Sequence, residues 1–183
     1  MKLEFKNIKK VFGKKTVLNN ISFTAKSGRA FGLLGRNGAG KTTTIRILMN
    51  VFKATSGEIL LDGKPLDYKS VSFGYLPEER GLYPKEKIFD QLVYLANLKG
   101  MNKKDAEKSI NYWLDFLNMS EYKNKQLDTL SKGNQQKIQL ISSIAHDPDI
   151  VVFDEPFSGL DPVNAKLLES VVKEQVKQNK VVI

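Results

Sequence analysis

Residues 35–42 combine glycines, a lysine and a threonine at a spacing that suits phosphate binding. They read Gly-Arg-Asn-Gly-Ala-Gly-Lys-Thr and fit the pattern G-x-x-x-x-G-K-[ST]. Glycines let backbone N–H groups turn inward around phosphate oxygens, which side chains would obstruct. Lys41 has the length to reach the β- and γ-phosphates, and the Thr42 hydroxyl is a ligand for Mg²⁺. The stretch therefore predicts a nucleotide site.

Two carboxylates follow a short apolar run at residues 150–153. Such a run is typical of a central parallel strand, and the tip of such a strand is where a doubly wound sheet places ligand-binding groups. Asp154 suits the Mg²⁺ shell, and Glu155 suits a general base that polarises an attacking water. A kinase would share both groups, so they do not decide the type of phosphoryl transfer.

Strands and helices must position these groups. Period-two alternation and apolar runs predict strands at residues 2–6, 21–25, 29–34, 57–61, 71–76, 150–153 and from 181 onward. Turns are expected at residues 12–15 and at Asp62-Gly63, the latter joining the strands at 57–61 and 71–76. Helical spacing predicts helices at residues 42–51, within 85–118, and at 133–145 and 163–178. This order indicates an α/β core that carries a helical insertion.

Composition narrows the class of protein. The chain has 183 residues, 41% of them hydrophobic, and a net charge of +9. The apolar fraction excludes a disordered tail. The absence of cysteine excludes disulfides, thiolate metal sites and a cysteine nucleophile. The first ten residues lack the apolar stretch of a signal peptide, and no apolar run approaches the ~20 residues that cross a bilayer. The basic balance is compatible with nucleic acid, an anionic membrane surface or an anionic ligand as partner.

Two further stretches carry a family resemblance. Residues 130–136, Leu-Ser-Lys-Gly-Asn-Gln-Gln, resemble the LSGGQ signature of ATP-binding-cassette (ABC) ATPases. Ser158-Gly159-Leu160-Asp161 resembles the D-loop of that family. With the phosphate loop and the two acids in the right order, the resemblance covers the whole chain.

The resemblance implies a fold and a set of partners. The expected fold is a P-loop NTPase core with a mostly parallel sheet, an N-terminal antiparallel β-subdomain and a helical insertion that carries the signature. Residues 1–183 would form one nucleotide-binding domain, with the helical subdomain at about 85–145. Cassettes of this family pair head to tail with ATP between them and Mg²⁺ as cofactor. The partners implied are a second cassette, identical or not, and a membrane-spanning permease, at the inner face of the cell membrane.

The resemblance also implies a role for each candidate site residue. Glu155 and Lys41 would be catalytic, and the metal ligands would be Thr42, Asp154 and Glu78. Phe12 would stack on adenine, Asp161 would couple the two composite sites, and Ser131 with Gly133 would contact the γ-phosphate bound by the partner. The nucleotide-binding residues implied are Phe12, Gly35, Arg36, Asn37, Gly38, Ala39, Gly40, Lys41, Thr42, Thr43, Ser131, Gly133, Asn134 and Asp161.

Three positions depart from the family pattern. Lys132 replaces a signature glycine, and Asn134 replaces a glutamine but keeps an amide. Glu78 stands where the family's Q-loop has a Mg²⁺-ligating glutamine, so the ligand there would be anionic. The surrounding residues 77–84 resemble ATPase subunits of the sodium- or drug-efflux type, which favours export.

The end of the sequence predicts a missing element. The family places a switch histidine beyond the strand that begins at Val181, and the sequence stops at Ile183. We therefore expect the C-terminal part to be absent and turnover to be weak. His146 precedes Asp154, where the family has no catalytic histidine, and we interpret it as a helix-end surface residue.

Three functions compete at this point. The leading hypothesis is the ATP-hydrolysing subunit of a membrane transporter, without a nucleic-acid partner. The alternative is a non-transport ABC ATPase that acts on nucleic acid or the ribosome, which the charge of +9 invites. The chain has no heptads, zinc module or second cassette to support that alternative, and its basic residues are scattered. A small-molecule phosphotransferase would leave the signature unexplained.

Overall fold

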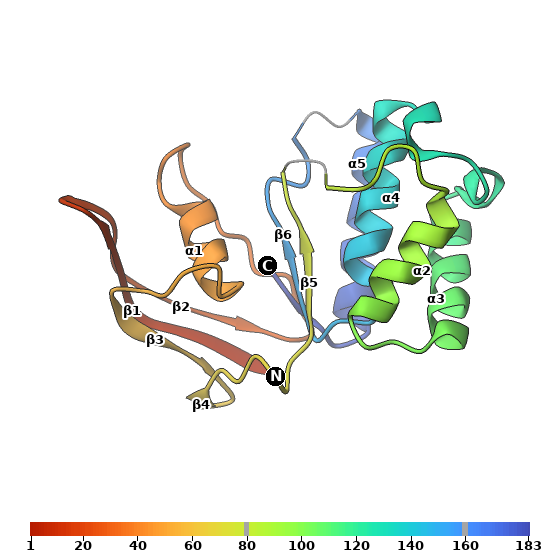
Figure 1. Ribbon diagram of the computed structural model, residues 1–183. Coiled ribbons are helices and arrows are strands. Elements are labelled where there is room, and N and C mark those ends of the chain that lie inside the picture. The colour runs from red at the N-terminus through yellow and green to blue at the C-terminus, as the bar shows by residue number, and fades with distance from the viewer. Residues whose placement is uncertain (79–80, 159–160) are drawn as a thin grey trace. The chain divides into compact units, whose positions relative to one another are not determined.

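The computed structural model describes residues 1–78, 81–158 and 161–183 (Figure 1). The chain divides into two compact units. The first unit contains residues 1–73, 149–154 and 172–183, and the second contains residues 74–148 and 155–171. Within the described residues, no helix is both long and apolar enough to pass through a bilayer.

An antiparallel sheet dominates the first unit. Its strands are β1 (Lys2–Phe12), β2 (Lys15–Lys26), β3 (Ser56–Leu61) and β4 (Lys64–Pro65), in the order β2-β1-β3-β4. Leu3 and Phe5 of β1 are buried, which confirms the inward-facing positions expected from the alternation. Ile8, beyond the predicted strand, is also buried, after a shift in the β1–β2 register between Phe5 and Ile8. Phe5 stacks on Phe23 of β2 with ring centroids 4.2 Å apart. These pairs fix the register of the long β1–β2 hairpin.

The connection after β3 differs from the expectation. Asp62 and Gly63 have φ values of 50° and 80°, as in the two-residue turns that close tight hairpins. The turn therefore leads into β4, where Leu61 pairs with Lys64, and not directly to the next strand. That strand, β5 (Phe73–Leu76), begins later in the chain than predicted.

The strand predicted at residues 29–34 is wrong. Only Ala30 forms a bridge, in parallel with Val182, and Phe31 donates its N–H to the Val182 carbonyl. The bridge and the hydrogen bond both join this segment to β7 (Val181–Val182). Leu34 is 93% exposed, although its apolar character suggested a buried strand.

A short parallel pair completes the first unit. β6 (Ile150–Phe153) is buried at every residue and pairs in parallel with β7, so the sequence expectation for both strands is confirmed. Asp149 anchors the start of β6, because its carboxylate accepts hydrogen bonds from the Ser72 N–H at 2.9 Å and from the Ser72 hydroxyl at 2.8 Å. The α/β arrangement of antiparallel strands, parallel strands and helices is confirmed.

The second unit is mainly helical. It contains α2 (Ile88–Leu98), α3 (Lys103–Phe116), α4 (Lys132–Ile144) and the first part of α5 (Pro162–Lys177). Two short 3₁₀ turns, η1 (Ser120–Tyr122) and η2 (Leu127–Thr129), connect α3 to α4. The side chains that pack between the helices include Ile88, Leu92, Ile110, Leu114, Ile138 and Ile141. The helices predicted at residues 133–145 and 163–178 are present within one residue of their predicted ends, whereas the one predicted at 42–51 ends three residues early, at Leu48.

Candidate nucleotide-binding site

The phosphate loop leads directly into helix α1 (Lys41–Leu48). Gly38 and Gly40 have φ values of 80° and 93°, which L side chains rarely adopt, and Gly40 caps the helix. A Cβ atom at Gly40 would lie 2.4 Å from Leu18 Cδ2 of β2. The glycine is therefore required both by its backbone angle and by the close approach of β2.

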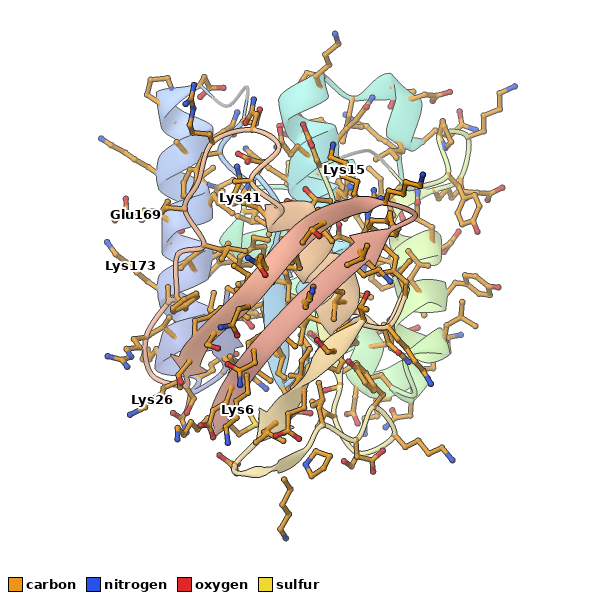
Figure 2. All side chains as sticks on the ribbon, turned by 90° about the vertical axis from the view of Figure 1, so that its left-hand side faces the viewer. Lys6, Lys15, Lys26, Lys41, Glu169 and Lys173 are labelled. Carbon is orange, nitrogen blue, oxygen red and sulfur yellow. The ribbon has the colours of Figure 1, made fainter. Side chains whose placement is uncertain are left out.

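Lys41 links the two ends of the loop. Its ammonium group donates to the Gly35 carbonyl at 2.8 Å and lies 3.5 Å from the Arg36 carbonyl. The Ala39 N–H donates to the same Arg36 carbonyl at 3.0 Å. Figure 2 shows the Lys41 side chain at the start of α1. The lysine thus places its charge at the centre of the loop, where phosphate oxygens would bind.

The rest of the loop suits an anion. Arg36, Asn37 and Ala39 are exposed, and Thr42 and Thr43 form the first turn of α1 and are partly exposed. That turn contains no acidic residue, so the positive end of the helix is not neutralised there. The backbone N–H groups at the start of α1 and the helix dipole together favour a phosphate at this position.

Phe12 lies at the end of β1 and is 46% exposed. Its ring meets the Phe52 ring edge-on with centroids 5.4 Å apart. The Lys10 ammonium lies 4.8 Å from each centroid and donates to the Lys53 carbonyl at 2.6 Å. Phe12 therefore offers an aromatic surface whose orientation is fixed by two neighbours that sequence reasoning missed. Lys10 and Phe12 are two residues apart on one strand and therefore lie on the same face, which was the signal in the sequence for this contact.

Asp154 lies at the same edge of the sheet as the phosphate loop. Val151, Val182 and Ala30 lie side by side in parallel alignment, and the chain runs on from Val151 to Asp154 and from Ala30 to the loop. The carboxyl ends of parallel neighbours meet at one edge, where ligands of α/β sheets bind. The Asp154 side chain is 4% exposed. Phe12, the loop and Asp154 all belong to the first unit.

The oxygen donors fit a magnesium nucleotide. Mg²⁺ commonly takes one or two protein oxygens and completes its octahedron with phosphates and water. Thr42 and Asp154 supply a hydroxyl and a carboxylate within one unit. Among the described residues there is no cluster of three His, Asp or Glu side chains that would make an all-protein metal cage. The donor set matches the Mg²⁺ of a nucleotide complex.

Glu155 and Glu78 belong to the second unit. Glu155 is exposed and has a φ of 50°, a conformation that is uncommon for a residue other than glycine, and its carbonyl accepts from the Ser158 N–H at 3.0 Å. This turn redirects the chain immediately after Asp154. Glu78 is exposed beyond β5. The adjoining residues Glu79 and Arg80, part of the efflux-type resemblance, lie outside the described residues.

The signature residues form the start of α4. Ser131 caps the helix, and its hydroxyl accepts from the Asn134 N–H at 3.4 Å. Lys132 is exposed, whereas Gly133 and Asn134 are partly buried. The helix predicted at residues 133–145 is confirmed, one residue earlier at each end. The same Ser131 hydroxyl that the resemblance assigns to a γ-phosphate thus also satisfies a helix N–H.

Asp161 caps the start of α5. Its carboxylate accepts from the backbone N–H groups of Val163 and Asn164, both at 2.9 Å, and from the Asn164 side-chain amide at 2.6 Å. The hydrogen bonds from Asn164, first of all the one from its backbone N–H, lower the pKa of Asp161 from its ordinary value of 3.8. Gly159 and Leu160 of the D-loop stretch lie outside the described residues.

Known proteins share this sequence and fold. The ABC transporter family model matches residues 18–158. An uncharacterized ABC transporter ATP-binding protein of Bacillus subtilis is 50% identical over 171 residues, covering 93% of this chain and 57% of that protein. One of Methanocaldococcus jannaschii is 50% identical over 182 residues, covering 100% and 66%. A solved structure described as the ATP binding subunit of an ABC transporter has a TM-score of 0.87 at 26% identity, covering 100% of this chain and 78% of that one.

The extent of these matches decides what they show. The chain spans less than two thirds of the length of the two curated relatives, 57% and 66%. The family model covers well over half of the chain, and its span includes the phosphate loop, the signature and both acids. The chain therefore belongs to the ABC transporter family, as an ATP-binding subunit, and that family uses ATP with Mg²⁺.

Proposed function

We propose that this protein hydrolyses ATP to drive transport through a separate membrane-spanning permease. The observation that carries the proposal is the phosphate loop, in which Lys41 bridges the loop ends ahead of an α1 N-terminus without acidic residues. In the proposed reaction, water attacks the γ-phosphate in line. Lys41 and the backbone N–H groups of the loop stabilise the developing charge, and Glu155 accepts a proton from the water. Thr42 and Asp154 would hold Mg²⁺, which would supply further neutralisation of the phosphate charge.

The proposal includes a pair of cassettes arranged head to tail. Ser131, Gly133 and Asn134 of one copy would contact the nucleotide held by the phosphate loop of the other, and Asp161 would couple the two sites. Glu78 would join Thr42 and Asp154 in the Mg²⁺ shell. The support is the resemblance of these motifs together with their placement at the N-termini of α4 and α5, which favour anions. The pair would lie at the inner face of the cell membrane, against the permease.

Hydrolysis is tested by measuring phosphate release with MgATP. Replacing Glu155 by glutamine removes the general base but keeps the size of the side chain. We expect release to fall about 100-fold or more, while MgATP affinity stays unchanged. Phosphate release that is the same in the Glu155→Gln variant would contradict the role of Glu155.

Export is the direction that we propose for the transport. The support is the resemblance of residues 77–84 to efflux-type subunits. Relatives are named for both directions: the zinc import ATP-binding protein of Rickettsia conorii is 38% identical over 159 residues, and the Nod factor export ATP-binding protein I of Burkholderia lata is 31% identical over 185 residues. Cells that lack the protein should become more sensitive to sodium or to drugs. A growth defect only on a scarce nutrient would indicate import.

The positive charge on β1 and β2 is compatible with one alternative function, action on nucleic acid. β1 and β2 carry the lysines Lys2, Lys6, Lys9, Lys10, Lys15 and Lys26 and one acid, Glu4. Figure 2 shows Lys6, Lys15 and Lys26 on these strands. Such a surface attracts any polyanion, ATP and nucleic acid included. Stimulation of ATP hydrolysis by RNA or DNA, and not by the co-purified permease, would favour the nucleic-acid alternative.

A further inference from the structure

The signature turn and the D-loop are in contact through one side chain. Gly133, in the first turn of α4, faces Asn164 in the first turn of α5, and both lie in the second unit. A Cβ atom at Gly133 would lie 2.9 Å from the Asn164 Nδ2 atom. Figure 1 shows α4 and α5 side by side, and residues of both helices line one pocket, among them Gly133, Leu140, Asn164 and Leu168.

Asn164 is held in this position by Asp161. The amide Nδ2 donates to one Asp161 oxygen at 2.6 Å, and the Asn164 backbone N–H donates to the other at 2.9 Å. The two bonds fix both the first turn of α5 and the plane of the amide. The amide therefore lies between the D-loop carboxylate on one side and the Gly133 Cα on the other.

The residue type at position 133 supports this contact. Gly133 lies inside α4 and its φ is not in the left-handed region, so its backbone does not require glycine. The space that a methyl group would take is filled by the Asn164 amide. The close approach of α5 therefore explains why position 133 of the signature is a glycine.

We propose that Asn164 is a positioning residue that ties the D-loop to the signature turn. Asn164 holds the signature turn, with Ser131 and Gly133, in a fixed position relative to Asp161. These three residues then contact the nucleotide of the partner cassette together. The proposal rests on the cassette pairing proposed above. It adds that the pairing requires a side chain that contacts no nucleotide, and it predicts loss of pairing without loss of ATP binding when that side chain is removed.

The test compares ATP-driven association with ATP affinity. All variants are made in the protein carrying Glu155→Gln, so that bound ATP persists, and association is measured by sedimentation. We expect Asn164→Ala to weaken ATP-driven association about 10-fold, which corresponds to ~1.4 kcal/mol and lies within the usual range for coupled groups. Its MgATP affinity, measured with a fluorescent nucleotide, should stay within about 2-fold. Val163→Ala is the matched control, because Val163 is 70% exposed and only its backbone bonds Asp161.

A double-mutant cycle tests the contact itself. Gly133→Ala alone should weaken association at least as much as Asn164→Ala, because the methyl group displaces the amide from Asp161. Gly133→Ala combined with Asn164→Ala should be no worse than Gly133→Ala alone, since the amide is already gone.

The outcomes distinguish a failure of the positioning role of Asn164 from a failure of the cassette pairing on which that role rests. Unchanged association in Asn164→Ala, additive effects in the cycle, or an equal loss of MgATP affinity would each overturn the positioning role. If the parent with the natural residues at 133 and 164 does not associate with ATP at all, the pairing itself is wrong and the positioning role falls with it. MgATP binding through the phosphate loop would survive that result.

Discussion

Gly40 of the phosphate loop packs against the side chain of Leu18 on β2, with no room between them for a methyl group. A Cβ atom at Gly40 would lie 2.4 Å from Leu18 Cδ2 and 3.4 Å from the Val17 carbonyl oxygen. The antiparallel sheet thereby sets the position at which α1 begins. The loop is shaped by β2 as well as by its own glycines.

Replacing Gly40 by alanine should destabilise the protein by about 2–4 kcal/mol. The left-handed backbone contributes about 1–2 kcal/mol and the contact with Leu18 adds an overpacking cost. Gly38→Ala is the control, because Gly38 has a φ of 80° but nothing lies within 4 Å of its Cβ position. In urea unfolding, the free energy of unfolding of Gly38→Ala should lie between that of the unsubstituted protein and that of Gly40→Ala. Equal losses for the two variants would show that Leu18 plays no part.

For the region around the phosphate loop, the sequence predicted the functional residues better than it predicted the secondary structure. The glycine spacing located the loop, and alternation located the first half of β1 and the second half of β2. An apolar run alone does not reveal which of its residues pair with a neighbouring strand, and within residues 29–34 only Ala30 forms a bridge. β4 was missed because two residues give no periodicity.

Contacts between distant residues were also hidden in the sequence. Phe52 joins Phe12 and Asn164 meets Gly133 only after folding, because each pair is far apart in the chain. Helical spacing predicted the helix at residues 163–178 but not the helix that Asn164 touches.

The Phe12 ring should contribute to ATP affinity only through the base. Phe12→Leu keeps an apolar side chain but removes the aromatic face, which is worth about 1–3 kcal/mol per stacked base. Binding of MgATP should weaken about 5-fold or more, whereas binding of magnesium tripolyphosphate should not change. Calorimetry with both ligands makes the comparison. A parallel loss for tripolyphosphate would mean that Phe12 acts on the fold of the loop and not on the base.

Lys10 and Phe52 should matter for the same ligand to a smaller degree. Lys10→Gln removes the cation that lies over both rings. The orientation of the Phe12 ring is then less restricted before binding, and fixing it on the base reduces the binding free energy. We expect a loss of MgATP affinity smaller than that of Phe12→Leu. Combining Lys10→Gln with Phe12→Leu should add little to Phe12→Leu, and a full additive loss would argue for a direct contact of Lys10 with nucleotide.

Ser131 should have separable structural and functional roles. Ser131→Ala removes the α4 cap and should cost about 1 kcal/mol of unfolding free energy. Ser131→Asp keeps a cap and places a negative charge where the dipole favours it, so stability should be retained. Both variants should lose ATP-driven association if the hydroxyl contacts the partner's γ-phosphate. Retained association in Ser131→Asp would contradict that contact.

Asp161 should make stability depend on pH in the acid range. Its pKa is lowered in the folded protein, so its contribution is present above the ordinary value of 3.8 and is lost as pH falls through the folded pKa. Asp161→Asn retains a good cap and removes this titration. The difference in urea midpoint between the two proteins should be constant at neutral pH and change only below about pH 4. A difference that is independent of pH down to strong acid would contradict the lowered pKa.

Equilibrium binding of MgATP to the protein and to its Lys41→Ala variant tests the central claim most directly. Lys41 supplies the charge at the centre of the loop, and its ammonium also links the loop ends through the Gly35 carbonyl. Truncating one partner of a charged contact with phosphate typically costs about 2–5 kcal/mol. Calorimetry should therefore show affinity at least about 30-fold weaker in Lys41→Ala, with an unchanged circular dichroism spectrum. Equal MgATP affinity in the two proteins would contradict the assignment of residues 35–42 as the nucleotide site.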